Sequence, residues 1–245
     1  MVDEMLEVEA KFSVPDRKTF DQLRKLTDLA GYSLLPSGEK TVYDQYMDTA
    51  DRALLRAGYA FRVRRESSGE GHYVATLKGL GGADADSGIH KREEHEVRVE
   101  SVDPLTWSDS PARDLAVRLS GGRPLLELFS LRQERHICLL CDEGARETRY
   151  VVELSLDVVS VDGDASGPYF EIELELLEQG SRPDLNTLSS RLQEEWALRP
   201  ETQSKFERGL ALMDAAAPVD RLEMGMDESL TAEERAVLQT WATTG

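Results

Sequence analysis

The sequence has only two cysteines, Cys138 and Cys141, among its 245 residues. They lie three residues apart in ICLLCD, a segment patterned like a strand, so alternation directs their side chains to opposite faces. A second pair that could complete a zinc site is missing from the sequence. We therefore expect buried free thiols in a fold that does not depend on disulfides.

A chain of this length can bury a sizeable core, as one large domain or two small ones.

Long apolar runs and positive charge are also scarce. The N-terminus does not resemble a signal peptide, and no run of about eighteen apolar residues occurs, so we expect a soluble, cytoplasmic protein without membrane contact. Lys and Arg number 29 against 47 Asp and Glu, a formal net charge of -18. That charge argues against non-specific binding to nucleic acid or to an anionic membrane. An anionic ligand would need a local basic site or metal ions.

What the sequence has in abundance is period-2 alternation, which is typical of strands. The connections SSGEG, GLGGADADSG and DGDASG are rich in glycine, as hairpin loops tend to be. We therefore predict an α+β protein built on an eight-stranded antiparallel barrel or a strongly curved sheet, with flanking amphipathic helices. The predicted strands are 6–13, 41–48, 59–66, 72–78, 90–100, 129–141, 149–161 and 169–177.

Helical spacing predicts four helices and leaves a distinct C-terminal segment. The first covers 16–30 with Gly31 as its C-terminal stop, and the second runs from Ser110-Pro111 to the glycines at 121–122. The third follows Pro183 and ends before Pro200, and the fourth covers 201–213. We expect residues 1–213 to form one domain. Residues 214–245 read as an acidic appendage or the stub of a further helical domain, in which Thr231 and Glu234 form a possible capping box.

Short charged runs occupy one face of strand after strand. Glu7, Glu9 and Lys11 alternate with apolar residues in the first strand, and similar runs are Arg62 with Arg64, and Glu171 with Glu173 and Glu175. For any single strand, a solvated outer face is the simpler explanation. Like charges in a row repel one another, however, so the repetition favours acidic and basic strands that face each other across an enclosed space.

Such an interior has a chemical use. A closed eight-stranded barrel is filled by side chains or holds one small ligand, while helices cover its apolar outer face. Inward-facing basic groups would bind phosphate oxygens, and inward-facing carboxylates would bind hard divalent cations such as Mg²⁺ or Mn²⁺. We therefore expect a polyphosphate together with a metal ion as the ligand.

A series of motifs in fixed order resembles the CYTH superfamily, also called triphosphate tunnel metalloenzymes. EVEAK matches the ExExK signature, and the resemblance continues through YMDTADRALLRAGYAFRVRRE, TLKG, HKREEHEV, VELSLD, FEIELELLE and QSKFERGL. It covers roughly residues 5 to 213 and is strongest to bacterial inorganic triphosphatases in which such a domain precedes a helical one. The resemblance implies an eight-stranded antiparallel tunnel that hydrolyses or cyclises triphosphates with Mg²⁺ or Mn²⁺.

The resemblance also implies roles for individual residues. It suggests Glu7, Glu9 and Lys11 as the residues most directly involved in catalysis. The implied metal ligands are Glu7, Glu9, Glu171 and Glu173, with Glu175, Asp157 and Glu153 as supporting acids or ligands through water. Glu94 and Glu96 would orient the cations, and Glu96 could also approach a metal. The implied phosphate-binding residues are Lys11, Arg62, Arg64, Lys78 and Arg92, with Lys205 reaching one mouth of the tunnel.

Several assignments have alternatives. In the sixth strand many relatives carry K-x-R where this chain has QER, so we expect Arg135 to face inward and Arg132 outward. Lys205 could instead cap a helix or pair with a surface acid, and Asp157 could pair with an arginine. Tyr46 and Asp48 fit better as part of a connection than as substrate contacts. No catalytic histidine is expected from His72, His90, His95 and His136.

Rival functions also stay open. A cyclase of the same fold would make cyclic AMP from ATP, but the sequence shows no recognisable purine pocket. A thiamine triphosphatase is a further possibility, and a non-catalytic sensor would bind polyphosphate without turnover. The preferred reading is hydrolysis of inorganic triphosphate to pyrophosphate and phosphate.

Overall fold

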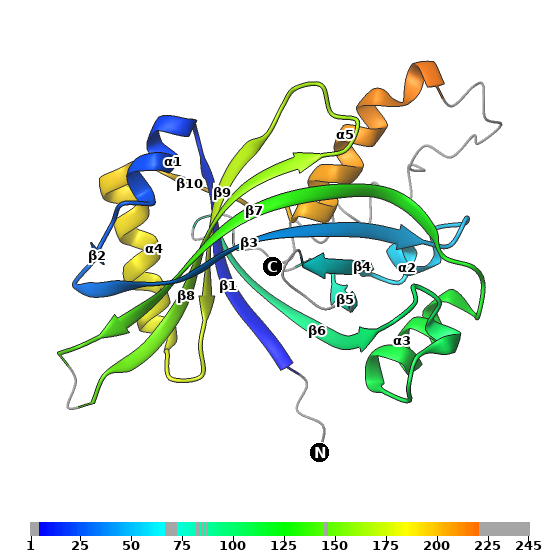
Figure 1. The fold of residues 1–245 in the computed structure, drawn as a ribbon, viewed down its shortest axis with the longest axis horizontal. Helices are drawn as coiled ribbons and strands as arrows, with labels where there is room; N and C mark the ends of the chain where they lie inside the picture. Colours follow the sequence, from blue (N-terminus) through cyan, green and yellow to red (C-terminus); the bar gives the residue numbers. More distant parts are fainter. Residues whose placement is uncertain are drawn as a thin grey trace.

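The computed structural model describes residues 5–66, 73–81, 84, 86, 88–144 and 147–220, with the backbone alone for residues 5, 6 and 214–220. Its centre is a closed barrel of antiparallel strands in the order β1–β6–β5–β4–β3–β7–β8–β9, in which β9 pairs with β1 (Figure 1). This confirms the predicted eight-stranded barrel. The strands are β1 Met5–Val14, β3 Tyr32–Asp48, β4 Tyr59–Glu66, β5 Tyr73–Gly79, β6 Ile89–Val99, β7 Leu126–Asp142, β8 Arg149–Val161 and β9 Tyr169–Leu176.

Strand β1 closes the barrel because its two halves pair with different partners. Glu7 lies opposite Arg92 of β6, and Lys11 lies opposite Glu173 of β9. Beside Lys11 the chain approaches closely: a Cβ on Gly88, which has φ +66°, would lie 2.5 Å from the carbonyl oxygen of Lys11. A glycine at position 88 therefore allows the backbone contact that fixes Lys11 at the seam.

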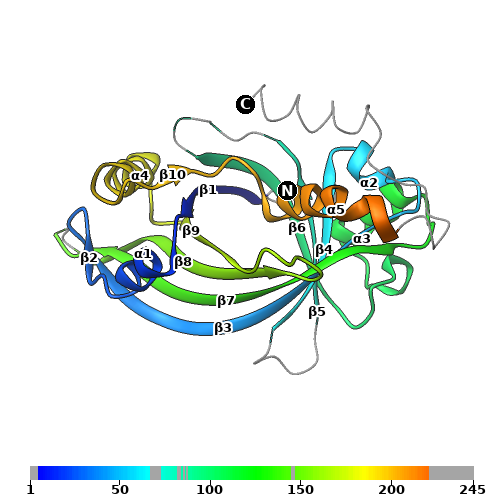
Figure 2. The same ribbon diagram turned by 90° about the horizontal axis from the view of Figure 1, so that it is seen from above.

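Helices cover the apolar outer face of the barrel on two sides, as predicted (Figures 1 and 2). Helices α1 (Arg17–Leu23) and α4 (Arg182–Trp196) pack on Phe12, Leu154 and Leu174. Helix α3 (Pro111–Ser120) packs on Phe61 and Leu77 at the opposite side. The remaining helices are α2 (Ala53–Arg56), the short 3-10 helix η1 (Pro104–Thr106) and α5 (Lys205–Asp220). Burial of the apolar faces leaves the alternate, charged positions pointing inward.

The predicted second helix is confirmed in its details. The hydroxyl of Ser110 accepts a hydrogen bond from the N–H of Arg113 (3.2 Å), Pro111 is the first helical residue, and Gly121 ends the helix with φ +63°. Ser-Pro at the start and glycine at the end are the residues that cap helices most effectively.

The predicted first helix is wrong beyond residue 23. Helix α1 ends at Leu23, and β2 (Asp28–Leu29) then pairs with the start of β3. Ala30 and Gly31 both have positive φ, 56° and 84°, which is the backbone of a two-residue hairpin turn. Gly31 therefore serves a strand hairpin instead of a helix end, and β3 is longer than predicted.

The connection after β3 is organised by Asp48, which is 1% exposed. Its carboxylate accepts hydrogen bonds from the backbone N–H groups of Thr49, Leu54 and Leu55 at 2.7 to 2.9 Å. Asp48 thus satisfies the free donors at the start of α2. This agrees with the predicted role of Asp48 in the connection.

The C-terminal part of the chain is described only as far as residue 220. Helix α5 continues through the predicted domain boundary at residue 213, and the predicted capping box of Thr231 and Glu234 lies outside the described residues. The division into a domain and an appendage stays a prediction. Among the described helices, none combines the length and the apolar character needed to cross a membrane.

Candidate active site

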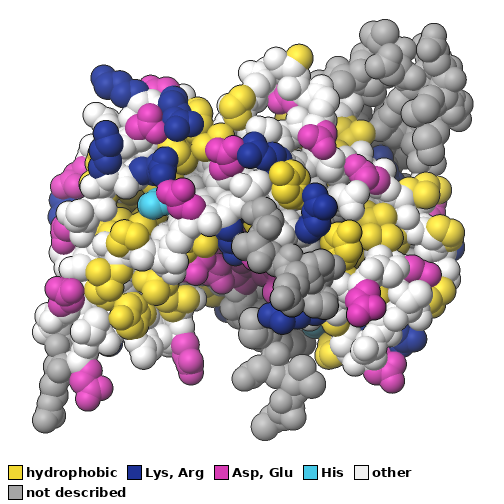
Figure 3. Space-filling view, in the orientation of Figure 1, with side chains coloured by type: hydrophobic (Ala, Val, Ile, Leu, Met, Phe, Trp, Pro, Cys, Tyr) yellow, Lys and Arg dark blue, Asp and Glu magenta, His cyan; other side chains and the backbone are white. Residues whose placement is uncertain are grey.

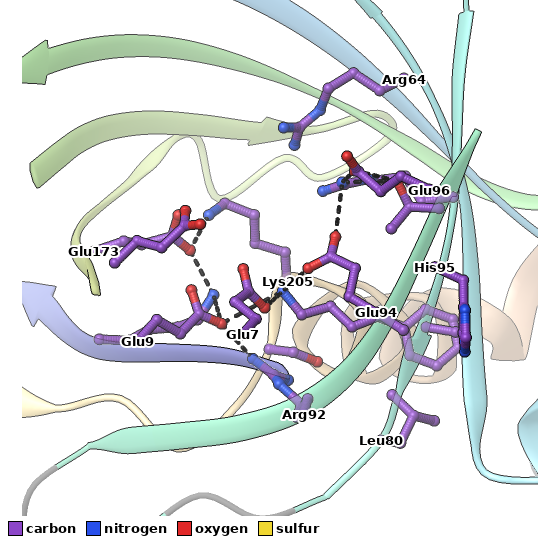
Figure 4. A pocket seen from close by; sticks show the side chains of 18 of the residues that line it. Glu7, Glu9, Arg64, Leu80, Arg92, Glu94, His95, Glu96, Glu173 and Lys205 are labelled. Carbon is purple, nitrogen blue, oxygen red and sulfur yellow. Dashed lines mark hydrogen bonds and ion pairs between the residues drawn. The ribbon is translucent and has the colours of Figure 1, made fainter. Parts of the chain in front are cut away.

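The barrel encloses a cavity of about 820 Å³ into which the charged faces of the strands point (Figure 4). Glu7, Arg62 and Glu173 all line it, although they come from three different strands. Acidic side chains are visible in the hollow near the centre of the face in Figure 3. The seven basic side chains in the wall are Lys11, Arg62, Arg64, Lys78, Arg92, Arg135 and Lys205, and seven glutamates join them: Glu7, Glu9, Glu94, Glu96, Glu173, Glu175 and Glu178.

Glu9 is the most heavily paired carboxylate at the β1 side of the cavity. Its Oε1 lies 2.7 Å from Nη2 of Arg92, 3.3 Å from Nζ of Lys11 and 3.5 Å from Nζ of Lys78. Burial alone would raise the pKa of Glu9, but the charges of Lys11, Lys78 and Arg92 outweigh burial and hold it below its usual range. Glu9 is therefore ionised at neutral pH.

Glu7 lies next to Glu9 and is less well compensated. The ammonium of Lys78 contacts Glu7 and lies 3.6 Å from Glu94. Burial and the neighbouring charge of Glu9 nevertheless raise the pKa of Glu7 to about 7. Glu175 lies opposite Glu9 in the β1–β9 register and is exposed. We call Glu7, Glu9, Glu94 and Glu175 the outer acidic cluster.

A second group of acids is buried deeper, on β8 and β9. Carboxylate oxygens of Asp157, Glu171 and Glu173 lie within 4.8 Å of one another, and we call these three residues the inner acidic cluster. Nζ of Lys205 lies 2.8 Å from Glu173 and 3.1 Å from Asp157, and it also contacts Glu171. Burial raises the pKa of Glu171 to about 7 despite Lys205. Lys205 is predicted to reach one mouth of the tunnel; the structure buries its side chain among these three acids, so it neither pairs with a surface acid nor lies in solvent.

Besides Lys205, two more cations contact the inner acidic cluster. Arg135 donates to Asp157 from Nε (2.8 Å) and Nη2 (2.6 Å), and its Nη2 also donates to Glu173 (2.6 Å). Nζ of Lys11 lies 2.5 Å from Glu173. The pairing of Asp157 with an arginine, which the sequence left as an alternative, is therefore present. Arg132 is half-exposed and pairs with Glu134, so Arg135 is the inward-facing residue as predicted.

Asp44 of β3, which the sequence analysis did not single out, holds two of the cavity arginines. It accepts from Nε and Nη2 of Arg64 at 2.7 and 2.8 Å and from Nε2 of Gln133 at 2.6 Å, and it lies 3.8 Å from Arg62. Burial would raise the pKa of Asp44, but Arg64 and Arg62 outweigh burial and lower it to about 2. Asp44 therefore fixes the positions of Arg62 and Arg64.

Arg62 keeps donors available for a ligand. Its Nη2 donates to Thr76 (3.1 Å) and lies 3.6 Å from Glu96, which also accepts from Thr76 (2.9 Å). Within the described part of the chain, Nε of Arg62 and Nε of Arg92 are buried and lack a hydrogen-bond acceptor. Buried donors without a partner are costly, and a bound anion would offer these two an acceptor.

One end of the barrel is closed by the start of helix α5. Phe206 lies against Tyr46 and Phe129, with ring centroids 5.5 and 6.1 Å apart. A Cβ on Gly209 would come within 2.2 Å of the Phe129 ring, so a glycine is needed there for the helix to pack. We call the start of α5, where Phe206 and Gly209 pack against Phe129, the plug. Tyr46 lines the cavity and also supports the plug. Because the plug fixes α5, the side chain of Lys205 is held inside the barrel.

Two predicted acids remain, Glu96 of β6 and Glu153 of β8. The side chain of Glu96 is 49% exposed and Glu153 lies opposite Glu175 in the β8–β9 register. Both Glu96 and Glu175 line the cavity and are exposed, so the cavity is open to solvent beside each of them. Glu153 faces the outer acidic cluster and is suited to support it.

Three of the four histidines are described, and His72 lies outside the described residues; His95 lines the cavity, and the expectation that none is catalytic stays a prediction. His95 contacts Glu93, and Nδ1 of His136 lies 3.2 Å from Glu39. Nε2–H of the buried His90 donates to the carbonyl oxygen of Glu201 at 3.0 Å. Burial lowers the pKa of His90 from its ordinary 6.5 to about 3, so this residue is neutral in the folded protein.

His90 should make the protein sensitive to acid. The unfolded chain takes up a proton near pH 6.5 but folded His90 does so only near pH 3, so the stability that His90 contributes is present above pH 6.5 and is lost as pH falls toward 3. We expect a His90→Gln protein to lose less free energy of unfolding between pH 7 and pH 5 than the wild type, as measured by urea denaturation. Equal losses in the two proteins would contradict this.

Comparison with known proteins agrees with the family that the sequence motifs resemble. The CYTH domain family model matches residues 5–210. A search of the curated proteins gave no match. Among solved structures, the chain is similar to the putative adenylyl cyclase HpAC1 from Hippeastrum, with 19% identity, a TM-score of 0.65 and coverage of 84% of this chain and 95% of that one.

Two further solved structures share the fold. PH1819 from Pyrococcus horikoshii OT3 is 22% identical, with a TM-score of 0.52 and coverage of 84% of this chain and 98% of that one. A putative adenylate cyclase from Bacillus halodurans is 19% identical, with a TM-score of 0.53 and coverage of 82% and 96%.

Proposed function

This chain belongs to the CYTH family, and on that premise we propose that it is a divalent-metal-dependent triphosphatase that converts inorganic triphosphate to pyrophosphate and phosphate. The observation that supports the proposal most strongly is the enclosed cavity in which seven basic side chains face carboxylates. A highly charged, compact anion matches such a wall better than an apolar ligand would.

The basic side chains are suited to hold the phosphates. Arg62 and Arg92 each have a buried Nε donor without an acceptor in the described part of the protein. The ammonium of Lys78 lies close to three carboxylates of the outer acidic cluster. Guanidinium groups bind phosphate oxygens through short charge-assisted hydrogen bonds. With Asp44 fixing Arg62 and Arg64, this part of the site is organised before the ligand arrives.

The outer acidic cluster fits Mg²⁺ or Mn²⁺. Its donors are carboxylate oxygens, the ligands that these ions prefer, and its four carboxylates outnumber their close cations, Lys78 and Arg92. When bound, the metal ion would neutralise charge on the phosphate oxygens. Glu7 and Glu9 would hold it, with Glu173 and Glu175 in support.

The protein's own side chains would position the triphosphate and the attacking water. Hydrolysis of a phosphoanhydride needs mainly positioning and charge neutralisation. Lys11, Arg62 and Lys78 would hold the triphosphate in line, and a carboxylate of the outer acidic cluster would orient a water molecule and take its proton. The water oxygen bonds to a terminal phosphorus, the bond to the bridging oxygen breaks, and pyrophosphate leaves.

The structural neighbours support testing hydrolysis first. HpAC1 is described as a putative adenylyl cyclase with a dominant triphosphatase activity, whereas the Bacillus halodurans protein is called a putative adenylate cyclase. Each description belongs to that protein, and cyclase activity is therefore the rival to exclude. The cytoplasmic location and the lack of nucleic-acid and membrane partners stay predictions from the sequence.

A product assay tests the proposal. The purified protein is incubated with inorganic triphosphate, ATP or thiamine triphosphate, each with Mg²⁺ or Mn²⁺, and products are identified by phosphorus NMR and chromatography. We expect orthophosphate and pyrophosphate from inorganic triphosphate and no product after chelation of the metal. Cyclic AMP from ATP would identify a cyclase, and tight binding of triphosphate without any product would identify a sensor.

Removing one cavity arginine should weaken substrate binding selectively. A charge-assisted hydrogen bond contributes about 1.5–3 kcal/mol, so Arg62→Met is expected to raise KM for triphosphate by roughly 10- to 100-fold. Arg132→Met is the matched control, because Arg132 is an arginine on the outer face that pairs with Glu134. Steady-state kinetics of both variants give the comparison. Equal KM values for the two variants would remove Arg62 from the binding site.

A further inference from the structure

The two acidic clusters differ in how completely the protein neutralises them. The inner acidic cluster has three carboxylates and three close cations: Lys205, Arg135 and Lys11 all lie within 3.1 Å of at least one of its oxygens. The positive and negative side-chain charges are therefore equal in number, and all six side chains except that of Arg135, which is 11% exposed, are buried.

The outer acidic cluster is short of positive charge. Its four carboxylates face Lys78 and Arg92 as close partners, while Arg62 reaches Glu94 only at 4.0 Å. Lys11 lies 3.3 Å from Glu9, but its shorter contact is with Glu173 of the inner acidic cluster. Negative charge thus remains uncompensated at the outer acidic cluster, next to the open part of the cavity.

Lys205 occupies the place that a metal ion would take in the inner acidic cluster. Its ammonium contacts all three carboxylates, which is how a single cation sits among three acidic ligands. The side chain of Lys205 is 6% exposed, and the plug formed by Phe206 and Gly209 against Phe129 keeps its helix in place. Lys205 therefore has little freedom to leave the cluster.

A divalent ion in the inner acidic cluster would be opposed by charge. With Lys205 present, an added Mg²⁺ would lie among three buried cations whose charges the carboxylates already cancel. Repulsion between charges a few ångströms apart is strong where water is excluded. The same ion at the outer acidic cluster would instead reduce a surplus of negative charge.

We propose that Lys205 is the resident cation of the inner acidic cluster, so that the protein binds one divalent ion, at the outer acidic cluster, before triphosphate arrives. This inference rests on the proposed metal dependence and makes it more specific. It assigns Asp157 and Glu171 to binding Lys205 instead of metal, and it leaves Glu173 next to the outer acidic cluster, because Lys11 contacts both Glu173 and Glu9.

The number of bound ions tests the proposal without any turnover. Mn²⁺ is titrated into the full chain in the absence of phosphate, and free Mn²⁺ is measured by electron paramagnetic resonance. We expect one bound Mn²⁺ per chain in the wild type and two in Lys205→Met. Lys205→Arg keeps the charge and should again bind one, and the double variant Lys205→Met/Asp157→Asn should lose the second ion.

A folded Lys205→Met protein that still binds one Mn²⁺ would overturn the proposal. If that variant does not fold, Glu171→Gln in an otherwise unchanged chain decides the question. We expect Glu171→Gln to bind the same number of Mn²⁺ ions as the wild type, with an affinity within about twofold. The inference would be refuted if the wild type bound two Mn²⁺ ions and Glu171→Gln bound only one. Two ions in the wild type would leave the hydrolase proposal intact, and no bound Mn²⁺ at all would contradict both.

Discussion

Glu9→Gln is expected to lower the metal-dependent hydrolysis of triphosphate by about 10³-fold, equivalent to ~4 kcal/mol of transition-state stabilisation. Glu9 contacts Arg92, Lys11 and Lys78 and is ionised, so it is suited both to hold the metal ion and to organise the basic residues. The uncharged amide keeps the shape of the side chain and removes only its charge. The measurement is kcat/KM with saturating Mg²⁺, together with the affinity for Mn²⁺, which should also fall.

The matched control for this variant is Glu93→Gln. Glu93 lies on β6 with its side chain outside the cavity wall, where it contacts His95 and Tyr59. We expect its activity to stay within about twofold of the wild type. Far-ultraviolet circular dichroism and thermal melting show whether each variant is folded. A folded Glu9→Gln protein with the activity of the Glu93→Gln control would contradict the assignment of Glu9.

Asp44→Ala is expected to reduce the free energy of unfolding by about 3–5 kcal/mol, the cost of leaving buried charges without their partner. Asp44 is fully buried and accepts both hydrogen bonds from Arg64, so its removal leaves Arg64 and Gln133 without their acceptor. Urea unfolding at pH 7 measures the loss. Because the pKa of Asp44 is lowered to about 2, its contribution is present above its ordinary pKa of 3.8 and is lost as pH falls through 2.

Asp21→Ala serves as the control for Asp44→Ala. Asp21 pairs with Arg17 at 2.9 Å on the exposed side of α1, and exposed pairs of this kind contribute at most about 0.5 kcal/mol. A loss below about 1 kcal/mol in Asp44→Ala would mean that the Asp44–Arg64 pair does not hold this side of the cavity together.

Strand periodicity predicted the most important feature of the molecule. Side chains alternate strictly along a strand, so the faces of Glu7, Arg62 and Glu173 follow from position alone once the strands are identified. Six of the seven predicted basic residues lie on strands and line the cavity for this reason, whereas Lys205 reaches it from helix α5. The apolar residues between them required cover, which correctly predicted the helices on the outer face.

Other features could not be predicted because they depend on contacts between distant segments. Asp44 lies in a mixed strand without a run of charges, and its importance comes from Arg64, which is 20 residues away in the sequence. The turn at Ala30 and Gly31 looked like a helix end because a glycine with positive φ serves both purposes. The contact of Lys205 with Glu171 depends on how α5 enters the barrel, which no spacing encodes.

The proposed function requires triphosphate and its metal ion to bind inside the barrel, between the basic side chains and the outer acidic cluster. Crystals grown with Mn²⁺ and a non-hydrolysable imido analogue of triphosphate test this most directly through anomalous diffraction. We expect a manganese peak beside Glu7 and Glu9, with phosphates against Arg62 and Lys78. Phosphates bound outside the barrel, with no manganese at Glu7 or Glu9, would contradict it.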